Sequence, residues 1–269
     1  MNNYDYINFP VDLLKNYFNN PIQVLNDIFD YALWNYAKDL NVNEYYIKKI
    51  FSEEDFDRYN LTKEDLEENI YDGACNYVYE KASFLIAEKK FGVQAGNVEK
   101  SIKRGKELVN TYNHTKPPFS NIKQSIYFDY YKNEKDEWQN IMLLAFLGIR
   151  SIIGDKTYCK ITNNYLFARM AGERKAITSE KYLPKEIKKY YTEHYKRMIR
   201  VELEEKWHMT SYCGRGYFAS FDLEYKDLVK NIHKNSLKYR AKKTSKIKKE
   251  INEIVKLELE NELKSLKQS

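Results

Sequence analysis

The hydrophobic positions of this chain recur at helical spacing most clearly between residues 136 and 153, which form its most apolar segment. Its apolar residues are spaced three or four apart or lie side by side: Trp138, Ile141, Met142, Leu144, Ala145, Phe146, Ile149 and Ile153. This spacing is typical of a buried amphipathic helix. Gly154 and Asp155 follow directly and are expected to end it.

The pattern changes twice after this helix. Residues 157–161 alternate like a short strand. Thr162 is a suitable cap for a second helix, which Gly172 would end. The inward residues of this second helix would be Leu166, Phe167 and Met170.

Pro184 is well placed to begin a long helix reaching about Glu205. Its inner stripe would consist of Ile187, Tyr191, His194, Met198 and Val201. The next segment, residues 209–223, alternates around Gly214-Arg215-Gly216 and predicts a β-hairpin with a basic tip. We therefore expect a mainly α (α+β) fold in which residues 122–225 form a winged helix-turn-helix domain. A small α+β core with a hairpin and no ligand is the alternative.

The N-terminal part predicts a helical domain over residues 1–112. A short strand over residues 4–10 precedes helices over 11–18 and 22–40. Residues 41–72 are an acidic insertion that either is a solvated surface or faces a partner. Residues 82–108 suit either a second helix-turn-helix or a plain helical hairpin, turning at Gly92.

Residues 113–121 contain paired prolines and predict a linker. The aromatic stretch after residue 124 suggests an extended segment before a long apolar helix, as at the N-terminus. This parallel points to two tandem winged-helix units as a possible layout.

Charge is unevenly distributed. The net charge is +6, but residues 1–80 carry 6 Lys and Arg against 16 Asp and Glu, and residues 81–269 carry 39 against 23. A basic two-thirds suits a phosphate-bearing partner, and we expect double-stranded DNA. The candidate DNA-binding residues are Lys100, Lys103, Arg104, Arg174, Lys175, Lys185, Lys189, Lys196, Arg200, Arg215, Lys230, Lys234, Lys238 and Lys242.

Residues 226–269 predict a basic helical tail. Between residues 226 and 249 there are ten Lys and Arg against one acid, either an electrostatic arm or a solvated face. An apolar stripe follows, formed by Ile247, Ile251, Ile254, Val255, Leu259, Leu263 and Leu266. It predicts a docking helix or a homodimer through the C-terminal helix.

Nothing in the sequence supports an enzyme. Motifs for phosphate loops, serine nucleophiles and zinc proteases are missing. His194 and Arg197 have the spacing of a tyrosine-recombinase box, but the flanking residues lack that family's pattern. We expect no catalytic residue, metal, cofactor or small-molecule ligand.

The three cysteines are unpaired in sequence and are expected to be buried apolar residues. No run approaches the about 20 apolar residues that span a bilayer. We therefore expect a cytoplasmic protein without a membrane partner.

The segment KITNNYLFARMAG and the glycine-tipped hairpin resemble the winged-helix cores of replication-initiator and regulator proteins of bacterial plasmids and phages. The resemblance covers about residues 122–240, and more weakly 4–112. It implies a non-enzymatic DNA-binding protein, active in replication or transcription regulation, with helix 184–205 or helix 163–171 near the groove. The polar insertion 173–183 departs from the pattern and leaves the reading helix open. The competing function is a protein–protein interaction or assembly module built on the same fold.

Overall fold

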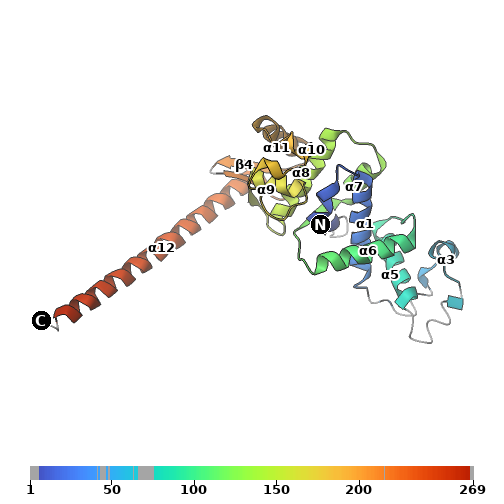
Figure 1. The fold of residues 1–269 in the computed structure, drawn as a ribbon, viewed down its shortest axis with the longest axis horizontal. Coiled ribbons are helices and arrows are strands. Elements are labelled where there is room, and N and C mark those ends of the chain that lie inside the picture. Colours follow the sequence, from blue (N-terminus) through green and yellow to red (C-terminus); the bar gives the residue numbers. More distant parts are fainter. Residues whose placement is uncertain are drawn as a thin grey trace.

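The computed structural model describes residues 6–40, 42, 47, 49–62, 64–65, 76–214 and 216–266. This part of the chain is mainly helical with two small antiparallel sheets, which confirms the mainly α expectation (Figure 1). The first elements are β1 (Tyr6–Pro10), the 3-10 helix η1 (Val11–Asn16), α1 (Pro21–Ala37), α3 (Glu53–Tyr59), α5 (Asn76–Phe91) and α6 (Val98–Asn113). Next come β2 (Phe119–Lys123), α7 (Gln124–Lys132), α8 (Glu137–Ile153), β3 (Cys159–Ile161), α9 (Asn163–Met170) and η2 (Glu180–Tyr182). The last are α10 (Lys185–Lys188), α11 (Glu193–Lys206), β4 (Thr210–Gly214), β5 (Gly216–Ser220) and α12 (Tyr225–Leu266).

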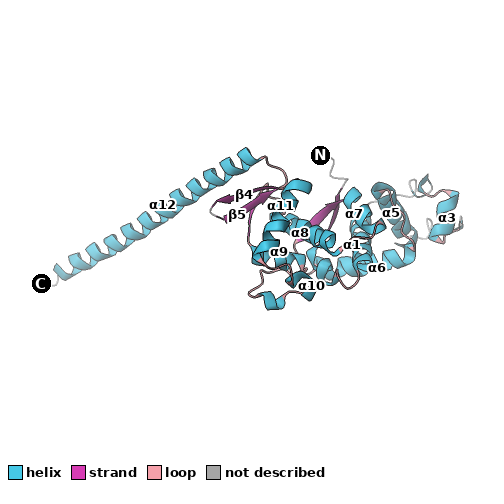
Figure 2. Cartoon of the chain, turned by 90° about the horizontal axis from the view of Figure 1, so that it is seen from above, coloured by secondary structure: helices cyan, strands magenta, loops and turns pink. Residues whose placement is uncertain are grey.

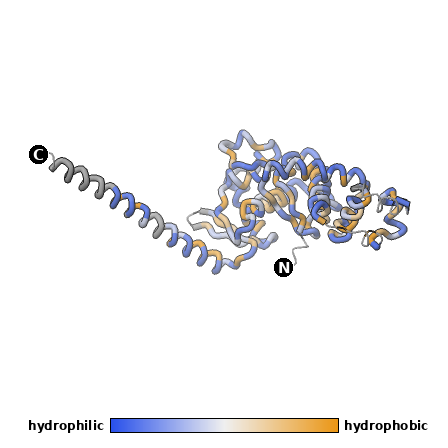
Figure 3. Tube along the Cα trace, turned by 90° about the horizontal axis from the view of Figure 1, so that it is seen from below, coloured by the Kyte–Doolittle hydropathy of each residue, from blue (hydrophilic) through white to orange (hydrophobic). Residues whose placement is uncertain are grey.

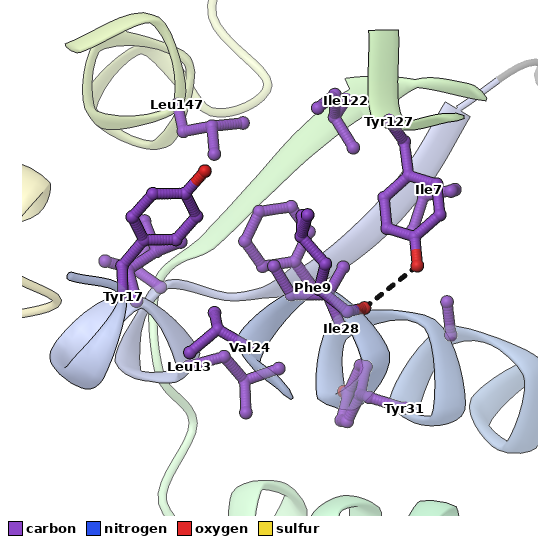
Figure 4. Packing of buried hydrophobic residues seen from close by; sticks show 14 of the residues in the cluster. Ile7, Phe9, Leu13, Tyr17, Val24, Ile28, Tyr31, Ile122, Tyr127 and Leu147 are labelled. Atoms are coloured by element: carbon purple, nitrogen blue, oxygen red, sulfur yellow. Dashed lines mark hydrogen bonds between the residues drawn. The ribbon is translucent and has the colours of Figure 1, made fainter. Parts of the chain in front are cut away.

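The N-terminal strand pairs with a strand more than a hundred residues away. β1 runs antiparallel to β2, with Ile7 opposite Ile122. Ile7 and Phe9 are fully buried and pack over α1, together with Tyr127 of α7 (Figure 4). The Tyr127 hydroxyl donates a hydrogen bond to the Leu25 carbonyl oxygen at 3.0 Å. The strand predicted near residue 4 is therefore confirmed.

Two expectations around this sheet need correction. Residues 119–121 of the predicted linker belong to β2, and the aromatic stretch expected to be extended is helix α7. Tyr and Phe favour strands weakly, and packing of Tyr127 and Phe29 as stacked rings overrides that preference. The division into domains at residues 113–121 stays a prediction.

Helices α5 and α6 form the predicted pair around Gly92, whose φ of 64° suits glycine. α6 lies against α1 without a gap at Gly105. A Cβ atom there would lie 2.5 Å from the Trp34 Cβ and 2.6 Å from the Asp30 carbonyl oxygen. The two helices and their turn are confirmed, whereas their use as a DNA-binding motif stays a prediction.

α3 lies within the acidic insertion and is anchored by one buried carboxylate. Glu88 of α5, which is 1% exposed, accepts hydrogen bonds from Arg58, from the Tyr59 hydroxyl and from the Ala95 backbone amide. This part of the insertion is therefore joined to the core and is not only a solvated surface. Residues 43–46, 63 and 66–75 lie outside the described residues.

The C-terminal core is built on α8, which is buried along most of its length. Asp136 and Gln139 form a capping box at its start, and Gly154 follows its end as predicted. Thr162 caps α9, whose inward residues are the predicted ones, Leu166, Phe167 and Met170.

The second sheet has the strand order β3-β5-β4, so the predicted hairpin is confirmed. Side chains alternate between its two faces. Cys213 and its partner Tyr217 share one face, on the side of α11, where Arg200 contacts the Cys213 Sγ. Tyr212 and its partner Phe218 share the other, where the ring of Tyr212 meets those of Tyr225 and His233 in α12.

The single long helix predicted for residues 184–205 is wrong. α10 ends at Lys188, and α11 begins at Glu193, because the Thr192 side chain accepts a hydrogen bond from the Tyr195 amide and starts a new helix. Because of this break, the buried face of α11 differs from the one predicted for a continuous helix. Ile199 and Leu203 are buried, whereas three residues of the predicted stripe are exposed: His194, Met198 and Val201.

α12 is a 42-residue helix that extends away from the rest of the molecule (Figures 1 and 2). At 1.5 Å per residue it is about 63 Å long. Leu228 is fully buried and fixes its first turns, while every described side chain from His233 to Tyr239 is exposed. Its described part is coloured mainly hydrophilic in Figure 3. None of the described helices has the length and hydropathy needed to cross a membrane.

Candidate nucleic-acid interface

Three cations gather on the first turns of α11, beside the hairpin. Lys196, Arg197 and Arg200 line a cleft of about 160 Å³ together with Asn163 at the start of α9 and Tyr217 of β5. Since two helices and a strand meet here, the cleft joins the parts of the domain that the sequence analysis expected near DNA.

Two of these cations are held in place by neighbours. The Lys196 Nζ lies 2.7 Å from Glu193 and 3.9 Å from the centroid of the Tyr191 ring, and its side chain is 12% exposed. The Arg200 Nη1 lies 3.1 Å from the Cys213 Sγ, and its Nε is 3.9 Å from a Glu204 oxygen. Their positions are therefore fixed before any partner arrives.

Arg197 differs from both, because it is exposed and has no acidic partner among the described residues. It was not among the candidates chosen from the sequence. The Thr192 cap sets the phase of α11 and places His194 and Arg197 on its exposed side. Thr192 is the sequence signal for the new helix start, but Pro184 is an equally good one, so the exposure of Arg197 could not be read from the sequence alone.

Three candidate lysines in the segment between α9 and α11 differ in whether an acidic side chain pairs with them. Lys175 and Lys185 are exposed and have no acidic partner in the described part of the chain. Lys189 is exposed but forms an ion pair with Glu137, which raises the pKa of the lysine. Its charge is therefore largely balanced within the protein.

Arg174 is engaged in contacts within the protein, and its use as a DNA contact stays a prediction. Its Nε and Nη2 donate to Asp12 at 2.8 and 2.6 Å, and its Nη1 donates to the Thr115 carbonyl oxygen at 2.9 Å. The fork geometry of a guanidinium suits such a bidentate pair. Arg174 joins the insertion after α9 to η1 and to the loop after α6.

The candidates on α6 also divide. Lys100 and Lys103 are exposed without an acidic partner among the described residues. Arg104 instead donates to both oxygens of Asp27 at 2.9 and 2.6 Å, an interaction that raises the pKa of the arginine. It connects α6 to α1 and is not a free cation.

The basic tail carries exposed lysines that form no ion pair in the described structure. Lys230, Lys234 and Lys238 are exposed on α12, and no acidic side chain in the described structure pairs with them. The α12 face that carries Tyr225 and His233 packs on the hairpin, so the hairpin lies between α11 and α12. Arg215 at its tip and the side chain of Lys242 lie outside the described residues.

The cysteines were expected to be buried, and neither of the two described ones is fully buried. Cys213 is exposed beside Arg200, and Cys159 is half-buried, whereas Cys75 lies outside the described residues. An antiparallel edge strand with a solvated tip explains the exposure of Cys213.

The hairpin lies between α11, which contacts one of its faces, and the start of α12, which contacts the other, and Arg104 and Arg174 lie outside this group. Comparisons with models of protein families, with curated proteins and with solved structures find no match to this chain.

Proposed function

We propose that residues 122–225 are a winged helix-turn-helix domain and that the protein binds double-stranded DNA without being an enzyme. The observation that carries the proposal is the position of the hairpin between two helices that both bear cations, α11 and α12. The element order α8–β3–α9–α11–β4–β5, with β3 paired to β5, supports it.

In this proposal α11 enters the major groove with its first two turns. Recognition helices contact base edges through their N-terminal residues. Here these turns expose His194 and Arg197, whereas the later turns carry Glu202, Glu204 and Glu205, which phosphates would repel. Leu166 and Phe167 of α9 are buried and this helix packs on α8, so in this proposal α9 supports the domain and does not read bases.

The exposed lysines of α12 contact phosphates beyond the groove. Such contacts position a protein on the duplex and add affinity without sequence preference. Three open cations, Lys230, Lys234 and Lys238, follow one another four residues apart along the helix. The biological role is that of a replication initiator or transcription regulator of a plasmid or phage.

A second candidate function is a protein–protein assembly module. It is favoured by Met198 and Val201, which are 40% and 36% exposed on α11 beside the cations. A partner protein could bury both of these apolar side chains. In the major groove of DNA, the apolar group available to contact them is the thymine methyl group.

Selection from random duplexes at moderate salt tests the two functions against each other. The parent protein should enrich one sequence class, and Arg197→Ala should lose preference at one or two base positions, at a cost of about 1–3 kcal/mol. Lys38→Ala is the matched control, since Lys38 ends α1 and pairs only with Asp39 among the described residues. Failure of the parent to retain any duplex would leave the assembly module as the function.

A further inference from the structure

A pocket with both apolar and polar walls lies in the N-terminal part of the molecule, away from α11 and the hairpin. It has a volume of about 600 Å³ and lies between α1, α3, the α5–α6 turn and α7. A second cavity of about 480 Å³ adjoins it along α6. The residues that line both are Asn26, Asp30, Gly96, Ser101 and Tyr131. The two spaces therefore meet at these side chains.

One wall is a column of parallel aromatic rings. Phe29 stacks on Tyr127 with ring centroids 5.7 Å apart, and Tyr127 stacks on Tyr131 with centroids 5.9 Å apart. The interplanar angles are 20° and 13°. Tyr131 is the last ring of the column, is 40% exposed and lines both cavities. Tyr131 is therefore an aromatic side chain that is both exposed and part of the lining of the two cavities.

Hydrogen-bonding groups lie where the cavities meet. Asp30 is 9% exposed, and its carboxyl is hydrogen-bonded by Ser101. Burial raises the pKa of Asp30 to about 6, so near neutral pH this carboxylate mainly accepts hydrogen bonds. The amide of Asn26 adds one donor and one acceptor group. This set matches the mixed edge of a nucleobase.

Both spaces that share Tyr131 are lined by cations. Lys100 and Lys103 line the cavity along α6, and Lys132 lines the larger one. All three are exposed and none forms an ion pair among the described residues, although Lys100 lies near enough to Asp30 to interact with it electrostatically. The other cations of the larger cavity are already engaged, Arg58 by Glu88 and Lys89 by Asp55. The open charges therefore line both of the spaces that share the exposed ring.

We propose that the joined cavities bind one unstacked base of single-stranded nucleic acid. The base stacks on Tyr131, its edge is read by Asp30, Asn26 and Ser101, and the flanking phosphates meet Lys132 on one side and Lys100 and Lys103 on the other. Aromatic stacking beside a basic groove is the usual means of holding single strands. A free nucleotide has phosphate on one side only, and so it fits the two-sided charge less well than a strand. The proposal rests on the proposed function for its nucleic-acid partner, but it uses a separate surface.

The test uses the full-length protein, a labelled twelve-nucleotide oligothymidine and a blunt duplex of the same length, followed by fluorescence anisotropy. Tyr131→Ala should weaken single-strand binding on the order of 5- to 100-fold, the range that loss of one stacked base gives. Tyr131→Phe should bind like the parent, since it keeps the ring. Tyr182→Ala is the matched control, because Tyr182 is 73% exposed and lies in η2. Duplex binding should be unchanged in all three variants.

Unchanged single-strand binding by Tyr131→Ala would overturn the proposal, as would an equal loss for both DNAs. Complete competition by thymidine monophosphate at the concentration of the oligonucleotide would also overturn it. If Tyr131→Ala melts at a lower temperature, the double variant Lys100→Ala, Lys103→Ala decides, since both side chains are exposed. This double variant should lose at least as much affinity for the single strand as for the duplex. Arg197→Ala should lose duplex binding, whereas Tyr131→Ala should keep it. This pair of results would distinguish the single-strand site from the proposed duplex interface.

Discussion

The two basic helices that flank the hairpin carry their charges in opposite ways. On α11, Lys196 and Arg200 are each held by a neighbouring glutamate, by an aromatic ring or by a cysteine sulfur. On α12, Lys230 and Lys234 extend into solvent without an acidic partner in the described structure. Helix α11 therefore presents two held cations and one open arginine, Arg197, around a cleft, whereas these two lysines of α12 are unpaired.

This difference teaches how affinity and selectivity can be divided between two neighbouring elements. Fixed side chains lose little conformational entropy on binding, and they can meet only a partner that fits their geometry. Their glutamate partners reduce the net charge that they offer. Open lysines attract phosphate at longer range, are sensitive to salt and accept any sequence. We expect α11 to control which duplex is bound and α12 to control how tightly.

Removal of the open charge should have the largest effect. The triple variant Lys230→Gln, Lys234→Gln, Lys238→Gln should weaken binding to all duplexes alike and reduce the slope of log K against log salt by up to about three, at nearly one per contact. Anisotropy titrations at several salt concentrations measure this. The triple Lys→Arg variant keeps the charge and should bind like the parent. A triple Gln variant with altered sequence preference would contradict the division between the helices.

Arg197→Ala should have a smaller effect of a different kind. The exposed arginine on α11 is expected to contact a base, so its loss should cost about 1–3 kcal/mol on the preferred duplex and less on unrelated ones. Competition between the two duplexes measures the difference. A uniform loss on both would place Arg197 among the phosphate contacts and remove selectivity from α11.

Internal ion pairs should affect folding and leave DNA binding in place. Arg104→Ala leaves the carboxylate of Asp27, which is 13% exposed, without its bidentate partner. We expect a loss of about 1–3 kcal/mol in the free energy of unfolding, measured by urea denaturation. Lys103→Ala, one residue earlier on α6 and exposed, is the control and should change stability little. Equal stability of the two variants would show that the pair with Asp27 is not structural.

The smallest expected effect is on the pH dependence of stability, and it comes from the buried carboxyl of Asp30. Burial raises the pKa of Asp30 from 3.8 to about 6, and the carboxylates and cations around it, Asp27, Arg104 and Lys100, only modify this effect. The folded protein then binds more protons than the unfolded chain between these two values, so stability falls as pH rises from about 4 to about 6. Asp30→Asn should remove this fall and be more stable than the parent above pH 6 by about 1–2 kcal/mol. Urea denaturation at several pH values measures this. If the free energy of unfolding depends on pH in the same way for the parent and for Asp30→Asn, the raised pKa of Asp30 is contradicted.

Much of the fold follows from local chemistry that is visible in the sequence. Asp136 and Thr162 are cap residues at the start of helices, and Gly154 and Gly172 stand where helices end. The break before α11 was missed because Pro184 and Thr192 are both good start signals, and the sequence does not show that both are used. The exposed phase of α11 was therefore assigned wrongly.

The candidate site was harder to predict than the fold, because charge depends on distant partners. Arg174 is paired with Asp12, 162 positions earlier, and Arg104 with Asp27, 77 positions earlier. No local sequence pattern reveals such pairs. The exposure of the lysines on α12 could be expected, because residues 226–249 contain only one acidic residue that could pair with them. The ring column of α7 was missed for a different reason, because its tyrosines were assigned to an extended segment.

The most direct test of the central claim is hydrogen–deuterium exchange of the full-length protein with and without its selected duplex. The account predicts slower amide exchange on binding in the first half of α11, in the β4–β5 hairpin and in the first turns of α12, with α8 and α1 unchanged. A duplex that binds without protecting α11 and the hairpin would contradict it.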